Sequence, residues 1–143
     1  MCEAAVLYTD GASKGNPGPA GAGFVLYSED GVAIARAGIP LGEATNNVAE
    51  YRGLIAGLHE ASARGIGRVR VRTDSQLLVR QLTGRYRVRS ERIRRYYEWA
   101  QRLVARFEDF QIEHIAREDN AEADRLASDA AKCAGGGRDE RRG

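Results

Sequence analysis

Residues 4–11 read AAVLYTDG, an apolar run that ends in Asp10 and Gly11. A short apolar run bounded by turn residues is typical of a buried strand, here over residues 4–10. Asp10 therefore stands where a strand leaves the core. A carboxylate beside an apolar run is costly to desolvate unless a cation neutralises it. Asp10 is thus a candidate for binding a cation at the end of the first strand.

Two further strands are predicted directly after the first. Residues 11–23 are rich in Gly and Pro, which indicates a turn. The apolar runs at residues 23–27 and 32–37 flank the sequence Glu-Asp-Gly at residues 29–31, a strong hairpin signal. We therefore expect the first three strands to form an antiparallel meander.

The rest of the chain alternates between helical and extended patterns. First comes a long helix, which has Thr45 as its N-cap and ends at Gly65 and Gly67. A strand over residues 68–73 follows, then helices over residues 75–82 and about 90–107, and then a strand over residues 110–115. The last element is a helix in which Asp119 and Glu122 form a capping box. This order predicts an α/β fold with a mixed five-stranded sheet: an antiparallel meander of three strands plus two parallel strands, with helices on both faces. The right-handed crossover rule places the strand before Asp74 beside the strand before Asp10.

The length and composition fit one globular domain. The chain has 143 residues, of which 43% are hydrophobic and 29% are charged. This length provides one core of ordinary composition. We expect the domain to span residues 1–134. Residues 135–143, GGGRDERRG, are predicted to form a disordered tail because they carry almost no apolar side chain.

Several sequence features favour a cytoplasmic protein. No apolar run approaches the roughly 20 residues that span a bilayer, and no secretory signal is visible at the N-terminus. The two cysteines, Cys2 and Cys133, lie near opposite ends of the chain, so a disulfide framework is not expected. We expect a monomer in the reducing cytoplasm, with no membrane partner.

Four carboxylates lie beside apolar runs, each in a different predicted element. They are Asp10, Glu50, Asp74 and Asp124. If they converge, they form a site for hard divalent metals, and Mg²⁺ prefers oxygen ligands. Taken singly, Asp10 and Asp74 are also explained as turn or helix-capping residues. That explanation does not account for the whole set.

Residues 85–106 carry a local excess of positive charge. The chain as a whole has a net charge of +2, whereas this segment contains eight arginines and only two glutamates. Such a segment can form a phosphate-facing surface. The alternative is a solvated helix face with salt bridges, and the carboxylate set favours the first interpretation.

Four motifs together resemble type 1 ribonuclease H. They are YTDGASKGNPGPAG at residues 8–21, TNNVAE at residues 45–50, TDSQ at residues 73–76 and NAEADRLA at residues 120–127. Each motif alone is weak, but they occur in the order and spacing of the family and cover nearly the whole chain. The resemblance implies the ribonuclease H-like fold. It also implies endonucleolytic hydrolysis of the RNA strand of an RNA–DNA hybrid, which leaves 5′-phosphate and 3′-hydroxyl ends.

The resemblance also implies a role for each carboxylate. Phosphodiester hydrolysis needs an activated water and stabilisation of the leaving oxygen, and two Mg²⁺ ions roughly 3.5–4 Å apart provide both. In the family pattern, Asp10 bridges the ions and Asp124 helps to hold the ion that activates water. Glu50 and Asp74 hold the ion on the leaving-group side. Mn²⁺ is expected to substitute for Mg²⁺.

Five polar residues match substrate-contacting positions of the family. They are Asn16, Thr45, Asn46, Asn47 and Gln76. Neutral amides can reach minor-groove edges and the 2′-hydroxyl that separates RNA from DNA. Thr45 matches a position that contacts a phosphate of the DNA strand. The simpler alternative is that Thr45 and Asn47 only start a helix and that Asn16 only forms a turn.

The chain departs from the family pattern at the product-release position. Many relatives carry a loop histidine there, and a gapless match from Asp124 backward places it at His114. His114, however, falls inside a predicted strand. Arg117 or Glu118, on the short loop that follows, are the alternatives for this role.

A second departure concerns the grip on the DNA strand. Some relatives insert a basic, Trp-containing helix and loop between the two middle helices, and the link over residues 83–89 is too short for it. Hybrid affinity is therefore expected to fall on the arginines of residues 85–95, in particular Arg85, Arg87 and Arg89, on a flatter surface. Trp99 is predicted to lie in the core or on a helix surface rather than to stack on a base.

Two other functions remain open from the sequence. One is a non-catalytic hybrid-binding module of the same fold, against which the intact carboxylate set argues. The other is a DNA nuclease of the same superfamily, such as a resolvase or transposase core. The turn at residues 15–18 and the Thr-Asn-Asn sequence at residues 45–47 favour the hybrid-specific enzyme.

Overall fold

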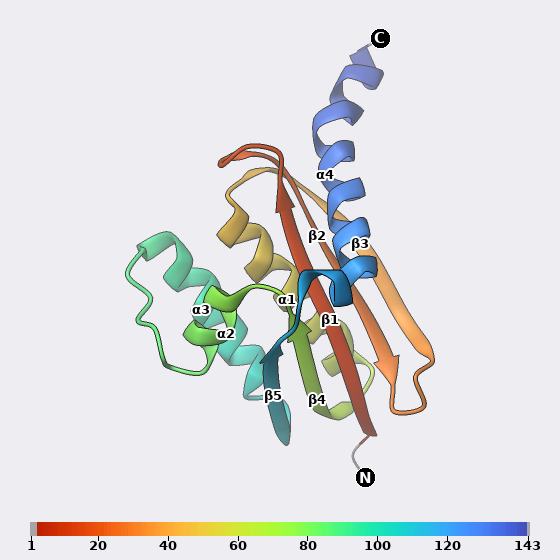
Figure 1. The fold of residues 1–143 in the computed structure, drawn as a ribbon, viewed down its shortest axis with the longest axis vertical. Helices are drawn as coiled ribbons and strands as arrows, with labels where there is room; N and C mark the ends of the chain where they lie inside the picture. The colour runs from red at the N-terminus through yellow and green to blue at the C-terminus, as the bar shows by residue number, and fades with distance from the viewer. Residues whose placement is uncertain (1–2, 143) are drawn as a thin grey trace.

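The computed structural model describes the backbone of residues 3–142 and the side chains of residues 3–135 (Figure 1). Its elements are β1 (Glu3–Ser13), β2 (Gly18–Ser28), β3 (Ala33–Ala44), α1 (Asn46–Ala63), β4 (Ile66–Thr73), α2 (Gln76–Leu82), α3 (Glu91–Val104), β5 (Asp109–His114), a 3₁₀ helix η1 (Arg117–Asn120) and α4 (Ala121–Arg142). Among the described residues, no helix is both long and apolar enough to cross a membrane.

The strands form one sheet in the order β3-β2-β1-β4-β5. β1 pairs antiparallel with β2, and β2 pairs antiparallel with β3. β4 pairs parallel with both β1 and β5. The predicted meander of three strands plus two parallel strands is confirmed, and so is the placement of β4 beside β1.

Helices cover both faces of the sheet, as predicted (Figure 1). α1 packs against β1 and β2, with α3 packed against α1, whereas α4 lies over β2 and β3. A Cβ atom on Gly11 would point at the α1 backbone at Ala49. A Cβ atom on Gly23, the cross-strand partner of Asp10, would point at the α4 backbone at Ala123. Because successive residues of a strand point to opposite faces, α1 and α4 lie on opposite sides of β1 and β2.

The main core lies between the sheet and α1. Leu7 and Leu26 of the sheet pack with Leu54 and Leu58 of α1, and all four are fully buried. Each such side chain contributes roughly 1.5–3 kcal/mol relative to an exposed one. This layer therefore fixes α1 rigidly against β1.

Three hydroxyl side chains start the helices on this side of the molecule. Thr45 accepts a hydrogen bond from the backbone N–H of Val48, at 3.3 Å, which confirms it as the N-cap of α1. Ser75 and Ser90 cap α2 and α3 in the same way. Such caps typically contribute about 1 kcal/mol each.

The predicted capping box at Asp119 and Glu122 is wrong. Asp119 lies inside η1, and α4 begins after it. Glu122 instead pairs with Arg36 of β3 and accepts a hydrogen bond from the Tyr27 hydroxyl at 3.4 Å. A guanidinium across the sheet is a stronger partner for a carboxylate than a backbone N–H, so Glu122 ties α4 to the sheet.

The backbone of α4 continues to Arg142, through most of residues 135–143, the segment that the sequence predicts as a disordered tail; Gly143 lies outside the described residues. Once a helix is nucleated by its packed first turns, each added residue gains one hydrogen bond, which favours its continuation. The strands β2 and β3 are also longer than predicted, because their Gly and Ala residues carry little strand signal.

Two glycines allow α1 to approach β1 closely. A Cβ on Gly11 would lie 2.4 Å from the backbone nitrogen of Glu50. A Cβ on Gly53 would lie 2.6 Å from the carbonyl oxygen of Asp10. Backbone therefore meets backbone at this contact, and any side chain there would push α1 away from the strand that carries Asp10.

We expect Gly53→Ala to destabilise the fold by about 1–3 kcal/mol through overpacking. This exceeds the gain of about 1 kcal/mol that alanine brings to a helix interior. The measurement is the free energy of unfolding by chemical denaturation, with Mg²⁺ affinity determined in parallel. Because α1 shifts relative to Asp10, Mg²⁺ affinity should fall as well.

Gly31→Ala is the control for this substitution. Gly31 has φ +85° and open space around its Cβ position, so alanine there costs stability through backbone strain alone. Its Mg²⁺ affinity should be unchanged. Equal Mg²⁺ affinity in Gly53→Ala and the wild type would contradict the link between this packing contact and the carboxylates.

Candidate active site

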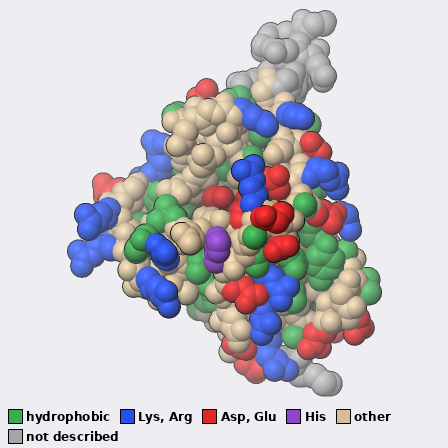
Figure 2. Space-filling model, viewed as in Figure 1, with side chains coloured by type: hydrophobic (Ala, Val, Ile, Leu, Met, Phe, Trp, Pro, Cys, Tyr) green, Lys and Arg blue, Asp and Glu red, His purple; other side chains and the backbone are tan. Residues whose placement is uncertain are grey.

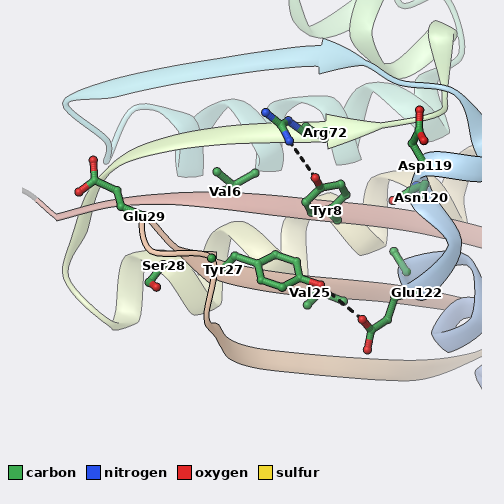
Figure 3. Close-up of a pocket in the computed structure, with 12 residues that line it drawn as sticks. Val6, Tyr8, Val25, Tyr27, Ser28, Glu29, Arg72, Asp119, Asn120 and Glu122 are labelled. Carbon is green, nitrogen blue, oxygen red and sulfur yellow. Dashed lines mark hydrogen bonds between the residues drawn. The ribbon is translucent and has the colours of Figure 1, made fainter.

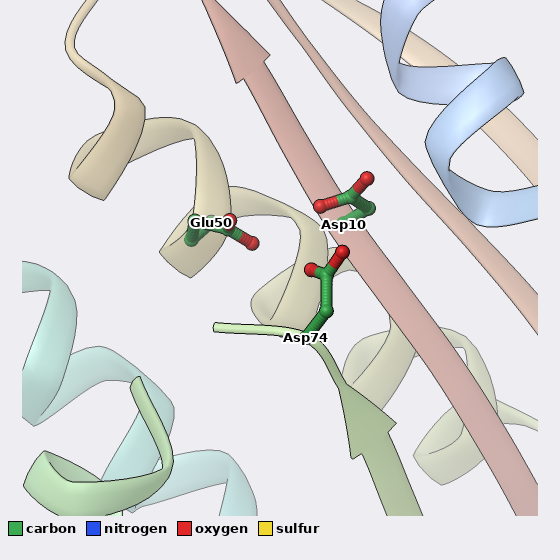
Figure 4. A group of neighbouring side chains, drawn as sticks. All are labelled: Asp10, Glu50 and Asp74. Atoms are coloured by element: carbon green, nitrogen blue, oxygen red, sulfur yellow. The ribbon is translucent and has the colours of Figure 1, made fainter. Parts of the chain in front are cut away.

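Three carboxylates from different elements meet at one end of β1 (Figure 4). Asp10 belongs to β1, Glu50 to α1, and Asp74 directly follows β4. One oxygen atom from each lies within 4.8 Å of the others. Asp10 is buried, and the other two are partly buried.

The sheet topology creates this meeting point. The pairing of β1 with β4 ends at Thr9 and Thr73, whereas β1 itself continues to Ser13. The edge of β1 is therefore open from Asp10 onward, beside the end of β4 where Asp74 lies. The close approach of α1 at Gly11 brings Glu50 to the same opening from the other face of the sheet.

Asp124 approaches the three carboxylates from α4. It lines the same pocket, of about 660 Å³, together with Asp10, Glu50 and Asp74. It lies close enough to Asp10 to raise the pKa of that carboxyl. The guanidinium Nη2 of Arg117 lies 3.9 Å from the Oδ1 of Asp124. The structure thus brings all four predicted carboxylates to one pocket.

Burial and mutual repulsion make this site electrostatically unfavourable without a cation. Burial, followed by the charges of Asp74 and Asp124, raises the pKa of Asp10 to about 8. Burial, followed by the charges of Asp10 and Asp74, raises the pKa of Glu50 well above its usual range. The Oε1 atom of Glu50 is buried and has no hydrogen-bond partner among the described residues.

These properties fit a site for a hard divalent cation. Carboxylate oxygens are the ligands that Mg²⁺ prefers. A bound cation also reverses the local preference for protonation, because it stabilises the charged form of each ligand. The unpartnered Oε1 of Glu50 would then gain a partner. Asp10, Glu50 and Asp74 are the residues that can hold such an ion.

A second polar pocket lies between the N-termini of α1 and α3. It has a volume of about 540 Å³ and is lined by Asn16, Thr45, Asn46, Asn47, Ser90, Arg92 and Ile93. The Asn16 side-chain oxygen accepts a hydrogen bond from the backbone N–H of Asn46 at 3.0 Å. Two helix N-termini and one arginine make the pocket attractive to an anion. Asn16 and Thr45 thus also have the structural roles that the sequence left open.

The chain matches proteins of one family along nearly its whole length. A family model described as "Reverse transcriptase-like" matches residues 8–130. Ribonuclease HI from Halobacterium salinarum is 46% identical to the chain over 123 residues, which are 86% of this chain and 62% of that protein. The chain therefore spans less than two thirds of the length of that relative.

Two solved structures agree closely with the fold. One is the N-terminal RNase H domain of Rv2228c from Mycobacterium tuberculosis, in a fusion with maltose binding protein. It is 42% identical to the chain and has a TM-score of 0.93, and the match covers 95% of this chain and 99% of that one. LC11 ribonuclease H1, in complex with an RNA/DNA hybrid, is 38% identical, with a TM-score of 0.86 over 91% of this chain and 98% of that one. The chain belongs to the ribonuclease HI family. The predicted resemblance and the ribonuclease H-like fold are thereby confirmed.

Three residues were candidates for the product-release position of the ribonuclease HI family. His114 is the last residue of β5, as its strand pattern predicted, but it also lines the carboxylate pocket. Arg117, on η1, lines that pocket as well. Glu118 is exposed on η1 and is not among the residues that line the pocket.

The remaining predicted contacts lie outside the carboxylate pocket. Gln76 is exposed at the first turn of α2, two residues after Asp74. Arg85 and Arg87 line a separate hollow of about 470 Å³, and Arg89 is exposed next to the start of α3. Figure 2 shows acidic side chains near the centre of one face, with Lys and Arg side chains around them and at its edge.

Sequence reasoning missed several residues that line the two pockets. Ser128 lines the carboxylate pocket because it follows Asp124 by one helical turn, a spacing that the sequence does contain. Lys14, at the start of the β1–β2 connection, brings a positively charged side chain to the same pocket. Ser90 carries no comparable signal, because its pocket depends on how α3 packs against α1. Arg92, which lines the same pocket, belongs to the arginine-rich segment that the sequence identified.

A hydrogen-bonded network braces the sheet beside the carboxylates (Figure 3). The Arg72 guanidinium donates to the Tyr8 hydroxyl at 2.8 Å and to the Glu113 carboxylate at 2.6 Å. The Tyr8 ring packs edge to face against Tyr27, at 5.6 Å between centroids, and Tyr27 reaches Glu122 of α4. Tyr8 and Arg72 each precede a site carboxylate by two residues, so the network holds β1 and β4 where Asp10 and Asp74 emerge.

The raised pKa values predict that the metal-free protein loses stability as the pH rises. A carboxyl group whose pKa is higher in the folded than in the unfolded state stabilises the fold below its ordinary pKa, and this contribution is lost as the pH rises toward the folded pKa. For Asp10 the window extends from 3.8 to about 8. The free energy of unfolding in chelator should therefore be lower at about pH 8 than at about pH 5.

Asp10→Asn and added Mg²⁺ test the cause of this loss. The variant removes one buried charge, so its stability should fall less between the two pH values. Mg²⁺ should restore the stability of the wild type at the higher pH and have a weaker effect on the variant. Identical pH dependence in both proteins would show that Asp10 is not the group responsible.

Proposed function

We propose that this chain is a metal-dependent endoribonuclease that hydrolyses the RNA strand of RNA–DNA hybrids and leaves 5′-phosphate and 3′-hydroxyl ends. The observation that carries the proposal is the convergence of Asp10, Glu50 and Asp74 within 4.8 Å, at a site that needs a cation. Membership of the ribonuclease HI family supports the same activity. We further propose a monomer that acts in the cytoplasm.

The proposed cofactor is a pair of Mg²⁺ ions, for which Mn²⁺ substitutes. When bound, such a pair supplies an activated water and stabilises charge on the leaving oxygen. Asp10 would hold both ions, because resemblance to the family gives its position this role and because Asp74 and Asp124 both lie close enough to raise its pKa. Glu50 and Asp74 are assigned to the leaving-group side, and Asp124 to the side of the attacking water.

The residues of the chain position the substrate around this centre. The pocket at the N-termini of α1 and α3 is suited to a phosphate of the DNA strand, which Thr45 and Arg92 would contact. The amide side chains of Asn16, Asn46 and Asn47 at the same pocket can contact base edges and 2′-hydroxyls. The complex of LC11 ribonuclease H1 with an RNA/DNA hybrid supports this class of substrate.

Two residues at the mouth of the carboxylate pocket can act in product release. His114 is exposed there, and a neutral imidazole can accept a proton. The Arg117 guanidinium offers N–H donors and no acceptor, so it can act only by attracting the product phosphate. Its side chain is 80% exposed and lies 3.9 Å from Asp124, which leaves it free to turn toward a departing phosphate. We assign proton transfer to His114 and phosphate attraction to Arg117.

A panel of nucleic acids tests the proposed activity. We expect cleavage of RNA–DNA hybrid with Mg²⁺ and with Mn²⁺, and no cleavage of double-stranded DNA. Cleavage should stop in chelator, because the carboxylate site then lacks its cations. Gel analysis of end-labelled strands reports both the strand that is cut and its end groups. Cleavage of DNA would favour the alternative DNA nuclease, and binding of hybrid without cleavage would favour the non-catalytic module.

Asp10→Asn is the matched control for this panel. It removes one negative charge from the metal site and leaves the phosphate contacts in place. Turnover should fall by several orders of magnitude, while hybrid binding stays within a few-fold of the wild type. Near-normal turnover of the variant would contradict the assignment of the metal site.

The arginines that precede α3 should make hybrid binding depend on salt. Each neutralised phosphate contributes about 0.9 to the slope of log affinity against log salt concentration for a duplex. Replacing Arg85, Arg87 and Arg89 by Gln should therefore reduce the slope by up to about 2.7. The measurement is fluorescence anisotropy with labelled hybrid over a range of salt concentrations.

A triple variant of equal charge serves as the control for the salt slope. Arg64 lies just before β4, and Arg68 and Arg70 lie on it; all three are exposed and line neither pocket. Their replacement by Gln should change the slope little. An equal change in both triple variants would mean that only net charge matters and would remove the specific role of Arg85, Arg87 and Arg89.

A further inference from the structure

One face of α3 presents a stripe of four arginines and the only tryptophan of the chain. The stripe consists of Arg92, Arg95, Trp99, Arg102 and Arg106, which recur at alternating spacings of three and four residues. This spacing places them on one side of a helix. Arg106 lies just beyond α3, and its backbone N–H still donates to Leu103 at 3.0 Å, so the helical turn continues to it.

The stripe takes no part in the core. All five residues are exposed, and the Trp99 side chain is 42% exposed. The face of α3 that packs against α1 is formed by other residues, namely Ile93, Ala100, Leu103 and Phe107. Folding therefore does not require an indole or a row of guanidinium groups at these positions.

The charges of the stripe are not balanced within the described structure. None of its four arginines belongs to an ion pair between described residues, although Glu91 and Glu98 lie on the same helix. Like charges three or four residues apart destabilise a helix slightly. A row of unpaired cations beside an exposed indole is complementary to a partner with regularly spaced negative charges and flat aromatic groups.

The stripe is continuous with the second pocket. Arg92, its first member, lines that pocket together with Thr45 and Asn46. From there the stripe runs for about 21 Å along α3, at 1.5 Å per residue. A nucleic-acid strand whose phosphate occupies the pocket can therefore continue along the stripe without leaving a positively charged surface.

We propose that the stripe binds single-stranded DNA that extends beyond the hybrid on the DNA strand, with a base stacked on Trp99 and phosphates on the flanking arginines. The inference rests on the proposed function, because it takes the second pocket as the site of the DNA strand. A duplex hides its base faces, whereas single strands offer them for stacking on an aromatic side chain. The enzyme would thereby prefer hybrids that are flanked by unpaired DNA.

The single tryptophan provides a direct readout of this contact. Stacking of a base on an indole quenches its fluorescence, and Trp99 is the only tryptophan in the chain. Chelator prevents cleavage during the titration. We expect strong quenching by a hybrid with a DNA overhang of about eight nucleotides and little quenching by the same hybrid with blunt ends. Overhangs at the 5′ and 3′ ends are tested separately, and we expect one of them to be effective.

Variants of the stripe separate stacking from charge. Wild type should bind the overhang hybrid roughly tenfold more tightly than the blunt hybrid, and Trp99→Ala should lose most of this difference. Trp99→Phe should retain part of it, because phenylalanine can still stack. Arg95→Gln with Arg102→Gln should reduce the salt slope for the overhang hybrid by about 1.4. Both Trp99 variants should bind and cleave the blunt hybrid as the wild type does, and the arginine pair should weaken binding of the overhang hybrid more than binding of the blunt hybrid.

The control pair is Arg68→Gln with Arg70→Gln, which removes equal charge from exposed positions on β4. It should leave the advantage of the overhang intact. Equal affinity of the wild type for both hybrids, or unchanged overhang binding in the stripe variants, would overturn the proposal and leave an acidic protein partner as the alternative occupant. Failure of the wild type to cleave blunt hybrid would instead contradict the proposed function, so the two failures are distinguishable.

Discussion

The close approach of backbone to backbone on both faces of β1 and β2 is the constraint on which the site depends. On one face, α1 contacts β1 where Gly11 and Gly53 leave no room for a Cβ atom. On the other, α4 contacts β2 at Gly23, where a Cβ would lie 2.6 Å from the Ala123 carbonyl oxygen. Side chains are short compared with the spacing of packed layers, so carboxylates from a strand and two helices meet only if the helices lie this close. Packing of the smallest residue type thus determines the geometry of the most charged site.

The stability of the core offsets the cost of that site. Buried, mutually repelling carboxylates destabilise the metal-free fold, as the raised pKa values of Asp10 and Glu50 indicate. Leucine packing between the sheet and α1, together with the network of Arg72 and Tyr8, keeps the elements in place when no cation is bound. A cation then binds to carboxylates that are already positioned, so little binding free energy is lost in ordering them. The same repulsion that weakens the fold therefore strengthens cation binding.

The sequence predicts those parts of the fold and site that have local causes. Asp10 and Asp74 were found because each follows a strand pattern, apolar before Asp10 and alternating before Asp74. Thr45 was found because a helix start favours a hydroxyl that accepts a backbone hydrogen bond. Glu122 was misread because its partner, Arg36, lies 86 positions away in the sequence, and no local rule anticipates that contact. Ser90 was missed for the same reason, since the pocket that it shares with Thr45 exists only once α3 has packed on α1.

The short link between α2 and α3 connects these observations to the substrate surface. With no inserted helix to cover it, the N-terminus of α3 lies beside that of α1, and the two create one polar pocket. The outer face of α3 also remains exposed, including Trp99 and Arg102. A protein that lacks the inserted basic helix and loop must find its electrostatic affinity on the helices that it already has. The concentration of arginine in and before α3, rather than throughout the chain, is what this requirement predicts.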